Sequence, residues 1–323
     1  TAGEIPILFH WNDPVKARSA LALSYDVDEN HFLIWRENAA GNATIFAARE
    51  TPSFSINTDY FSSRGNPFPE LVRISNHGFS HIQWLHHWNS DFMYMKSEID
   101  EIGKQLGKLS LELNEIHATK GVEKEWFAPE EYWRKAGVEL IKNRIDMTKR
   151  LGGDCIVLHT SETRNHETSK TQLKHGLKSL QDLENYSVSS GVKIALENLM
   201  PTFSFDVIEY YFSQFSPDFL GFCWDTGHSN ITGPDVSKRI EKIARERLCA
   251  VHLNDNDGKG RDQHQIPFDG TCNWEWITDV IKNSPYKKNK PLTMEVSASS
   301  YNDVDQFLAK AKKIGEKLTQ MVT

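Results

Sequence analysis

The chain has 323 residues, which exceeds the usual size of a single hydrophobic core and leaves either two domains or one large barrel fold. Lys plus Arg total 37 against 44 for Asp plus Glu, and this net charge of −7 disfavours a protein whose main task is to grip a phosphate backbone. With 39% hydrophobic and 25% charged residues, the composition excludes intrinsic disorder, collagen and coiled coil.

The apolar residues are spread along the chain, and no run of about 18 of them occurs, so we expect no membrane span. The four cysteines lack CxxC spacing, which favours buried, reduced thiols. We expect a cytoplasmic location. A removed leader stays open as an alternative, because the chain starts at Thr1 without an initiator Met.

Residues 1–51 precede the regular part of the chain. Two β-rich runs, Phe32 to Trp35 and Ala43 to Phe46, flank the turn-forming Ala40-Gly-Asn and predict a hairpin. We expect this N-terminal extension to pack on the following domain. An oligomer contact is the alternative, and a homo-oligomer therefore stays open.

From residue 52 to residue 323, short β-rich runs alternate with stretches of helical periodicity, which is typical of βα units and a parallel sheet. The predicted strands are Phe54 to Phe61, His81 to His87, Ser110 to His117, Asp154 to Thr160, Val192 to Asn198, Phe219 to Asp225, Leu248 to Asn254 and Leu292 to Ser297. The predicted helices are Pro69 to His77, Ser97 to Leu109, Glu130 to Leu151, Thr168 to Ser190, Ser204 to Phe215, Pro234 to Arg247, Trp274 to Lys282 and Asp303 to Leu318. Eight such units predict an α/β fold, the (β/α)₈ TIM barrel, over a doubly wound sheet, because no glycine-rich phosphate turn follows the first strand.

Polar residues end six consecutive predicted strands, where a barrel of this kind places its active site. These ends are Glu115-Ile-His117, His159, Glu197-Asn198, Asp225-Thr-Gly-His228, His252-Leu-Asn-Asp255 and Glu295, and the loop after strand seven adds Asp262-Gln-His264. So many ionisable groups at one barrel mouth would repel or stay unsatisfied without a cation. Imidazoles and carboxylates are ligands for a borderline divalent metal such as Zn²⁺ or Mn²⁺.

The second predicted strand closes on an aromatic run that includes Trp84, His87 and Trp88. Aromatic rings stack on the apolar faces of sugars, so these three residues are candidate substrate contacts. An aromatic core under a loop is the alternative interpretation.

Several of these motifs resemble those of the xylose isomerase-like TIM barrels, a superfamily of sugar phosphate isomerases and epimerases that includes ketohexose 3-epimerases, inosose dehydratase and endonuclease IV. The motifs are Leu196-Glu-Asn-Leu-Met-Pro201, Trp224-Asp-Thr-Gly-His228, Val251-His-Leu-Asn-Asp255, Asp262-Gln-His264 and Met294-Glu295. The resemblance covers residue 52 to the end of the chain. Ketohexose epimerases carry an Arg shortly before a Pro-Gly after strand seven, whereas this chain has His264 before Ile266-Pro-Phe, which argues against a 3-epimerase of free ketohexoses.

The resemblance implies three sets of metal ligands. In the epimerase branch, one divalent metal would be held by Glu197, Asp225, His252 and Glu295. In the endonuclease branch, a second metal would be held by His117, His159 and Glu197, and a third by His228, Asp262 and His264. All nine positions are filled in this chain, and many sugar-isomerase relatives use the additional residues on substrate hydroxyls.

The sequence therefore predicts a metal-dependent sugar isomerase or epimerase of EC class 5, with a small-molecule carbohydrate as its substrate. Glu197 and Glu295 would carry a proton to and from a carbon next to a carbonyl, through an enediolate. We expect one divalent ion, Mn²⁺ or Zn²⁺, with Mg²⁺ and Co²⁺ as alternatives. A dehydratase or lyase acting on a keto-sugar, a three-zinc endonuclease IV-like enzyme for abasic DNA, and a catalytically inert sugar-binding barrel are the alternative functions, although the net charge disfavours nucleic acid as a partner.

Overall fold

The computed structural model describes residues 7–8, 31–37, 43–49, 53–62, 65–85, 93–118, 125–161, 166–286 and 290–323. These residues fall into two compact units, residues 1–51 and 52–323, which are described separately below. None of the helices in the described residues combines the length and the apolar character that a membrane span requires.

The N-terminal unit contains a small antiparallel sheet of three strands in the order β1-β3-β2. β2 (His31–Glu37) pairs with β3 (Ala43–Arg49) over their full lengths, which is the predicted hairpin with longer strands than expected. β1 (Ile7–Leu8) adds the third strand on the other side of β3. The predicted packing of this unit on the following domain stays a prediction.

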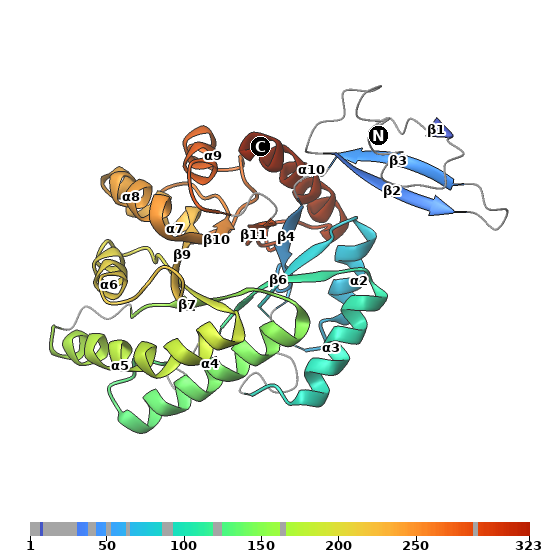
Figure 1. Cartoon of the computed structure of the whole chain (residues 1–323). Helices are drawn as coiled ribbons and strands as arrows, with labels where there is room; N and C mark the ends of the chain where they lie inside the picture. Colours follow the sequence, from blue (N-terminus) through green and yellow to red (C-terminus); the bar gives the residue numbers. More distant parts are fainter. Residues whose placement is uncertain are drawn as a thin grey trace. The chain divides into compact units, whose positions relative to one another are not determined.

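The second unit is a closed barrel of eight parallel strands, so the predicted fold class is confirmed (Figure 1). The strands are β4 (Phe54–Asn57), β5 (His81–Trp84), β6 (Glu112–His117), β7 (Cys155–His159), β8 (Lys193–Glu197), β9 (Leu220–Asp225), β10 (Leu248–Leu253) and β11 (Leu292–Met294). Each strand pairs with the next in chain order, and β11 pairs with β4 to close the ring.

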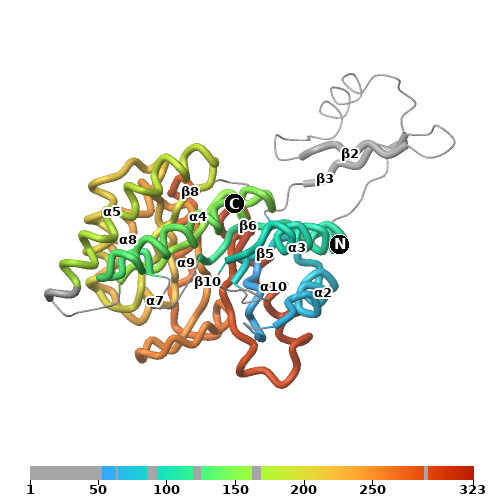
Figure 2. Tube along the Cα trace, turned by 90° about the horizontal axis from the view of Figure 1, so that it is seen from below, coloured from blue at the N-terminus to red at the C-terminus, as the bar shows by residue number. Residues whose placement is uncertain are grey.

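Helices surround the strands on the outside of the barrel, as the two perpendicular views show (Figures 1 and 2). They are α2 (Phe68–Asn76), α3 (Lys96–Lys108), α4 (Glu131–Leu151), α5 (His166–Ser190), α6 (Phe203–Phe212), α7 (Thr226–Thr232), the 3₁₀ turn η2 (Pro234–Val236), α8 (Ser237–Arg247), α9 (Trp274–Lys282) and α10 (Val304–Val322). The strands bury their outward apolar side chains against these helices in one continuous core.

The barrel interior contains both apolar and polar side chains. Cys155, Val157, Ala195, Cys223 and Ala250 form a small separate cluster of buried side chains inside the ring. Buried polar side chains include Ser55, Gln83, Glu115 and Thr293, from strands outside this cluster, and His252 from β10, which also supplies Ala250. Polar groups removed from water require partners. These buried polar side chains therefore need partners among themselves or among groups of the site above them.

Candidate metal centre

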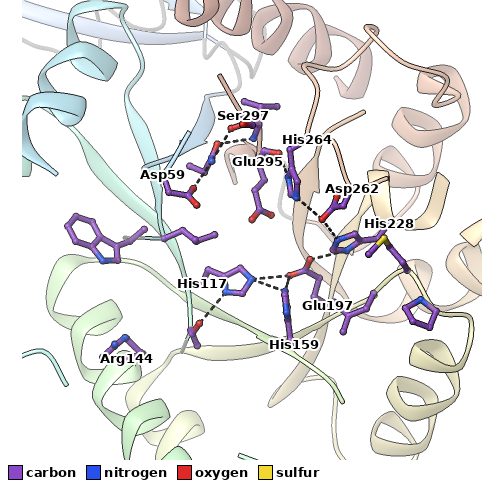
Figure 3. Close-up of a pocket in the computed structure, with 18 of the residues that line it drawn as sticks. Asp59, His117, Arg144, His159, Glu197, His228, Asp262, His264, Glu295 and Ser297 are labelled. Atoms are coloured by element: carbon purple, nitrogen blue, oxygen red, sulfur yellow. Dashed lines mark hydrogen bonds and ion pairs between the residues drawn. The ribbon is translucent and has the colours of Figure 1, made fainter. Parts of the chain in front are cut away.

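A cavity of about 500 Å³ lies at the carboxyl ends of the barrel strands, where a TIM barrel carries its active site. Figure 3 shows imidazoles and carboxylates from different strands directed into this space. The lining residues that carry a titratable side chain are Asp59, Tyr94, His117, Arg144, His159, Glu197, His228, Asp262, His264 and Glu295.

Two side chains that line this cavity and two that lie beside them bring their polar atoms together. The ligand atoms of Glu197, Asp225, His252 and Glu295 all lie within 4.8 Å of one another. His252 Nδ1 lies 2.6 Å from Glu295 Oε2 and 3.3 Å from Glu197 Oε2. These three atoms have no hydrogen-bond partner among the described residues, although all are buried. Buried carboxylate oxygens and an imidazole nitrogen this close to one another need a positive charge among them, either a proton or a metal ion, and three carboxylates with one imidazole match a hard or borderline divalent metal.

Asp225 is fixed by the local structure around the end of β9. Its side chain caps α7 by accepting a hydrogen bond from the backbone N–H of His228 at 2.7 Å. Its second oxygen accepts from Asn254 Nδ2 at 2.8 Å, and its backbone is bonded in both directions by Asn198. The Glu-Asn pair that ends β8 thus supplies one candidate ligand, Glu197, and one residue that holds the next.

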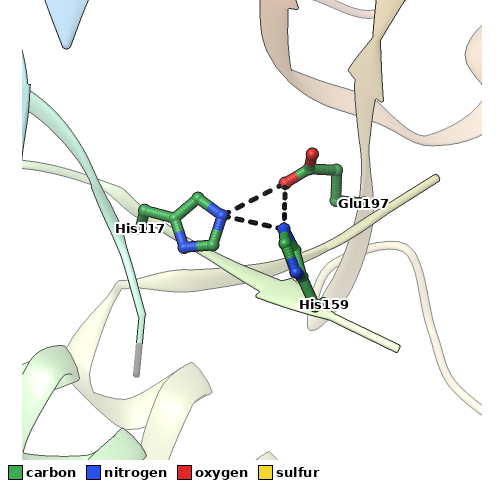
Figure 4. A group of neighbouring side chains, drawn as sticks. All are labelled: His117, His159 and Glu197. Atoms are coloured by element: carbon green, nitrogen blue, oxygen red, sulfur yellow. Dashed lines mark hydrogen bonds and ion pairs between the residues drawn. The ribbon is translucent and has the colours of Figure 1, made fainter. Parts of the chain in front are cut away.

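A second group joins β6, β7 and β8 (Figure 4). His117 Nε2 and His159 Nε2 lie 3.1 Å apart and at 3.4 and 3.3 Å from Glu197 Oε2. Two imidazole nitrogens and one carboxylate oxygen therefore meet at one point, with Glu197 shared between this group and the first. The arrangement needs a positive charge at its centre, either a proton or a metal ion.

A third group lies over α7 and the loop after β10. His228 Nε2 and His264 Nε2 lie 3.3 and 3.1 Å from the same oxygen of Asp262. His264 has a backbone φ of 45°, which is uncommon for a residue with a side chain, and its Nδ1 lies 2.9 Å from the carbonyl oxygen of Glu295. Strained backbone held in this way often marks a functional position.

The carboxylates at the centre of the site have shifted pKa values with opposing causes. Burial disfavours ionisation of Glu295, but the adjacent His252 outweighs burial and lowers the pKa of Glu295 to about 2. The pKa of Glu197 is also held well below its usual value, because His252 and His159 outweigh its burial. For Asp225, burial prevails over the attraction of His228 and raises the pKa to about 6. Glu197 and Glu295 are therefore stabilised as anions by positive neighbours, which is the electrostatic environment that a divalent cation supplies.

The pKa values of three imidazoles in the site are raised by the neighbouring carboxylates. Burial lowers the pKa of His264, but Asp262 and the other carboxylates outweigh it and raise the pKa to about 10. The pKa values of His117 and His228 are raised for the same reason, by Glu197 and by Asp225 with Asp262. In each group, carboxylates therefore raise the affinity of the neighbouring imidazoles for protons.

The aromatic candidates are placed only in part. Trp84 is almost fully buried, lines the cavity and donates from Nε1 to the hydroxyl of Tyr94 at 3.2 Å. β5 ends at Trp84, three residues before the predicted end of this strand. His87 and Trp88 lie outside the described residues, and a substrate contact by any of the three stays a prediction.

Sequence reasoning missed several residues at the cavity, among them Asn57, Asp59 and Arg144. Asp59 follows β4 and accepts a hydrogen bond from Asn57 Nδ2 at 2.7 Å, and Asn57 in turn exchanges two hydrogen bonds with the backbone of Val296. Arg144 reaches the cavity from α4, where it was predicted as part of an ordinary helix. The signal for Asp59 was the Asn57-Thr-Asp ending of the first strand, which the predicted range Phe54 to Phe61 concealed.

Comparison with known proteins places the chain in a family. The profile of the xylose isomerase-like TIM barrel family matches residues 71–318. The chain therefore belongs to the xylose isomerase-like TIM barrel family, as the sequence motifs predicted.

Several proteins are similar to this chain in sequence or in fold. The uncharacterized protein y4fM of Sinorhizobium fredii is 30% identical over 279 residues, which cover 78% of this chain and 88% of that protein. A probable endonuclease 4 of Carboxydothermus hydrogenoformans is 28% identical over 214 residues, covering 60% of this chain and 72% of its own. The crystal structure of a D-tagatose 3-epimerase-like protein superposes with a TM-score of 0.64 at 20% identity, covering 84% of this chain and 98% of its own, which shows the shared fold.

Proposed function

We propose that this protein is a divalent-metal-dependent isomerase or epimerase of a sugar or sugar derivative. The observation that carries the proposal is the convergence of Glu197 Oε2, His252 Nδ1 and Glu295 Oε2, three buried atoms without a hydrogen-bond partner among the described residues. With Asp225 they would hold one metal ion next to a cavity large enough for a monosaccharide.

A divalent cation bound there would polarise a carbonyl group and acidify the adjacent C–H bond. Glu295 and Glu197 come from strands three apart in the ring, and both line the cavity. One of the two removes the proton from the carbon next to the carbonyl and the other returns a proton, so the configuration or the position of the carbonyl changes. His228 and His264, fixed by Asp262, hold substrate hydroxyl groups.

The charge of the cavity favours a neutral substrate over a phosphate ester. Four carboxylates, those of Asp59, Glu197, Asp262 and Glu295, line it together with four histidines, and Arg144 is the single Lys or Arg among the described lining residues. Phosphate recognition requires several cationic or backbone N–H donors, and carboxylates recognise hydroxyl groups instead. Hydroxyl-rich sugars, keto-sugars and polyol derivatives fit this lining.

The metal set can be tested with Asp225→Ala. This substitution removes one ligand and the cap of α7, so the variant should lose bound Mn²⁺ or Zn²⁺ while circular dichroism still reports a folded barrel. Elemental analysis of wild type and variant after identical loading gives the answer. A variant that keeps the wild-type metal content would overturn the assignment.

The reaction class can be tested in D₂O with a panel of aldoses, ketoses and keto-glycosides. An isomerase or epimerase should place deuterium at the carbon next to the carbonyl of the accepted sugar. Loss of water or of an attached group in the same assay would instead identify a dehydratase or lyase, whose first proton transfer is the same.

An endonuclease IV-like activity is the second candidate. It is favoured by the nine filled ligand positions, which fall into three groups, and by the similarity to a probable endonuclease 4. Metal stoichiometry separates the two candidates, since the isomerase needs one ion and the endonuclease three.

A further inference from the structure

His252 is fully buried in the barrel, and its two ring nitrogens face different surroundings. Nδ1 points to the carboxylates of Glu197 and Glu295, at 3.3 and 2.6 Å. Nε2 points into the barrel interior, where Gln83 Nε2 lies at 2.8 Å and Glu115 Oε1 at 3.3 Å. The two nitrogens therefore serve different groups, and the proton of a neutral ring can occupy only one of them.

Glu115 is an unusual residue for this place. It lies on β6 two residues before His117, is fully buried, and has no hydrogen-bond partner for either carboxylate oxygen among the described residues. A buried carboxyl group without partners is costly, so its retention in the interior calls for a specific role. The ring nitrogen that faces it is His252 Nε2, at 3.3 Å from Oε1.

The side-chain amide of Gln83 is a second indication that the groups facing His252 Nε2 have a specific role. Its amide nitrogen is placed toward His252 Nε2, while its buried Oε1 has no partner among the described residues. The oxygen and nitrogen of an amide exchange places by a half-turn, and the hydrogen-bond network decides between them. The half-turn gives Oε1 a donor, His252 Nε2–H, at 2.8 Å, and it leaves the Nδ1 lone pair directed at Glu197 and Glu295.

We propose that Gln83 and Glu115 are positioning residues that accept the Nε2–H of His252 and thereby present its Nδ1 as a metal ligand. This inference rests on the metal site of the proposed function. Metal-binding imidazoles commonly donate their second N–H to an oxygen, which fixes the tautomer and the orientation of the ring. In this chain the acceptors come from β5 and β6, across the barrel from β10.

The test compares the variants Gln83→Met and Glu115→Gln, and the double variant with Met at both positions, with wild type. Zn²⁺ affinity is measured by competition with a chromophoric chelator, and the double variant should bind about 10- to 100-fold more weakly, the usual effect of removing such acceptors. Glu112→Gln is the matched control for Glu115→Gln, because it makes the same chemical change on the same strand at a side chain that is 79% exposed. The control should keep the wild-type affinity.

Two further measurements separate positioning from structural support. The metal-free double variant should melt within a few degrees of metal-free wild type, because it loses a buried polar pair rather than apolar packing. In the Zn²⁺-loaded wild type, ¹⁵N NMR of labelled histidine should find the proton of His252 on Nε2 and the metal-shifted signal on Nδ1.

The outcomes distinguish this inference from the function on which it rests. If wild type binds no Zn²⁺, the proposed metal site and this inference both fall. If wild type binds Zn²⁺ but the double variant binds it equally well, or if the proton of His252 is on Nδ1, the metal site stands and the positioning role is wrong. A lower melting temperature of the metal-free variant with unchanged affinity would likewise assign Gln83 and Glu115 to structure alone.

Discussion

Asp59 combines burial with access to the cavity. Its carboxyl group lines the cavity beyond β4 and is held by Asn57 at 2.7 Å. Burial raises the pKa of Asp59, and the negative charge of Glu295 raises it further, whereas the hydrogen bond from Asn57 lowers it. The net pKa is about 6. A carboxyl group with this pKa can exchange a proton with a substrate hydroxyl near neutral pH, which makes Asp59 a candidate substrate contact.

The raised pKa predicts a pH-dependent effect of Asp59→Asn on stability. An acid whose pKa is higher in the folded than in the unfolded protein costs stability once it ionises, so the cost is absent below about pH 4 and complete above about pH 6. In the presence of a chelator, the variant should match wild type at pH 4 and be about 1–3 kcal/mol more stable at pH 7. Denaturant unfolding at both pH values measures this difference, with the exposed Asp218→Asn as control. An equal difference at both pH values would contradict the prediction.

Glu295→Gln separates proton transfer from metal binding. The substitution keeps the shape and one ligating oxygen but removes the basic site, so the variant should retain part of the metal while deuterium exchange falls by at least ~10²-fold. Metal analysis and exchange in D₂O are measured on the same preparation. Exchange at the wild-type rate in a metal-loaded variant would make Glu295 a ligand only, and the base would then be sought first at His228 or His264.

The elements that were predicted best are those with the clearest periodicity. All eight barrel strands were placed from the sequence, because each is a short apolar run bounded by turn residues and followed by a helical pattern. Six of them end on or beside ionisable residues that line or underlie the cavity, and this made the candidate ligands visible. Their convergence in space follows from ring closure, which a parallel sheet of alternating units implies.

Elements without a periodic signal were missed. α7 has seven residues and follows β9 directly, and its start depends on capping by Asp225 rather than on an apolar face. Glu115 was grouped with the strand-end residues, yet the side-chain alternation of β6 places it in the interior, below His117. Which of two polar residues at a strand end faces the mouth depends on the register of its neighbours, and here β5 and β6 shift register between Ile82 and Gln83.

The close packing of α10 against β4 predicts how a substitution at Gly315 changes the stability of the protein. Gly315 lies in α10, and a Cβ there would come within 2.4 Å of the Phe54 ring on β4. Gly315→Ala should therefore destabilise the protein by about 1–3 kcal/mol, the usual cost of overpacking. The melting temperature measures this, with Gly107→Ala in α3 as the control, since a Cβ at Gly107 would meet nothing within 4 Å and Ala is the better helix former. Equal melting temperatures of the two variants would contradict the packing of α10 against β4.

For the molecule as a whole, the net charge and the composition of the site favour different functions. The nine candidate ligands form the three groups that the endonuclease branch of the family implies, which favours a nuclease. The net charge of −7 and the scarcity of Lys and Arg among the described lining residues oppose binding to a phosphate backbone, because nonspecific DNA affinity comes chiefly from Lys and Arg that displace counterions. A hydroxyl-rich neutral substrate satisfies both observations, since spare imidazoles and carboxylates can bind hydroxyl groups.

The balance of these effects predicts how the protein behaves toward damaged DNA. A duplex with one abasic site, incubated with Zn²⁺-loaded protein at moderate salt, should remain uncut, because the net charge of −7 opposes association with the phosphates before the site can act. Gel analysis of the labelled strand gives the result, and the same preparation must exchange deuterium into an accepted sugar so that inactive protein is not mistaken for a negative answer. Lowering the salt from about 200 to 50 mM should leave the duplex intact, although it raises the affinity of a true backbone binder about 10³- to 10⁵-fold. Efficient incision on the 5′ side of the lesion, together with three bound metal ions per chain, would reverse the ranking and make the spare histidines metal ligands rather than contacts for hydroxyl groups.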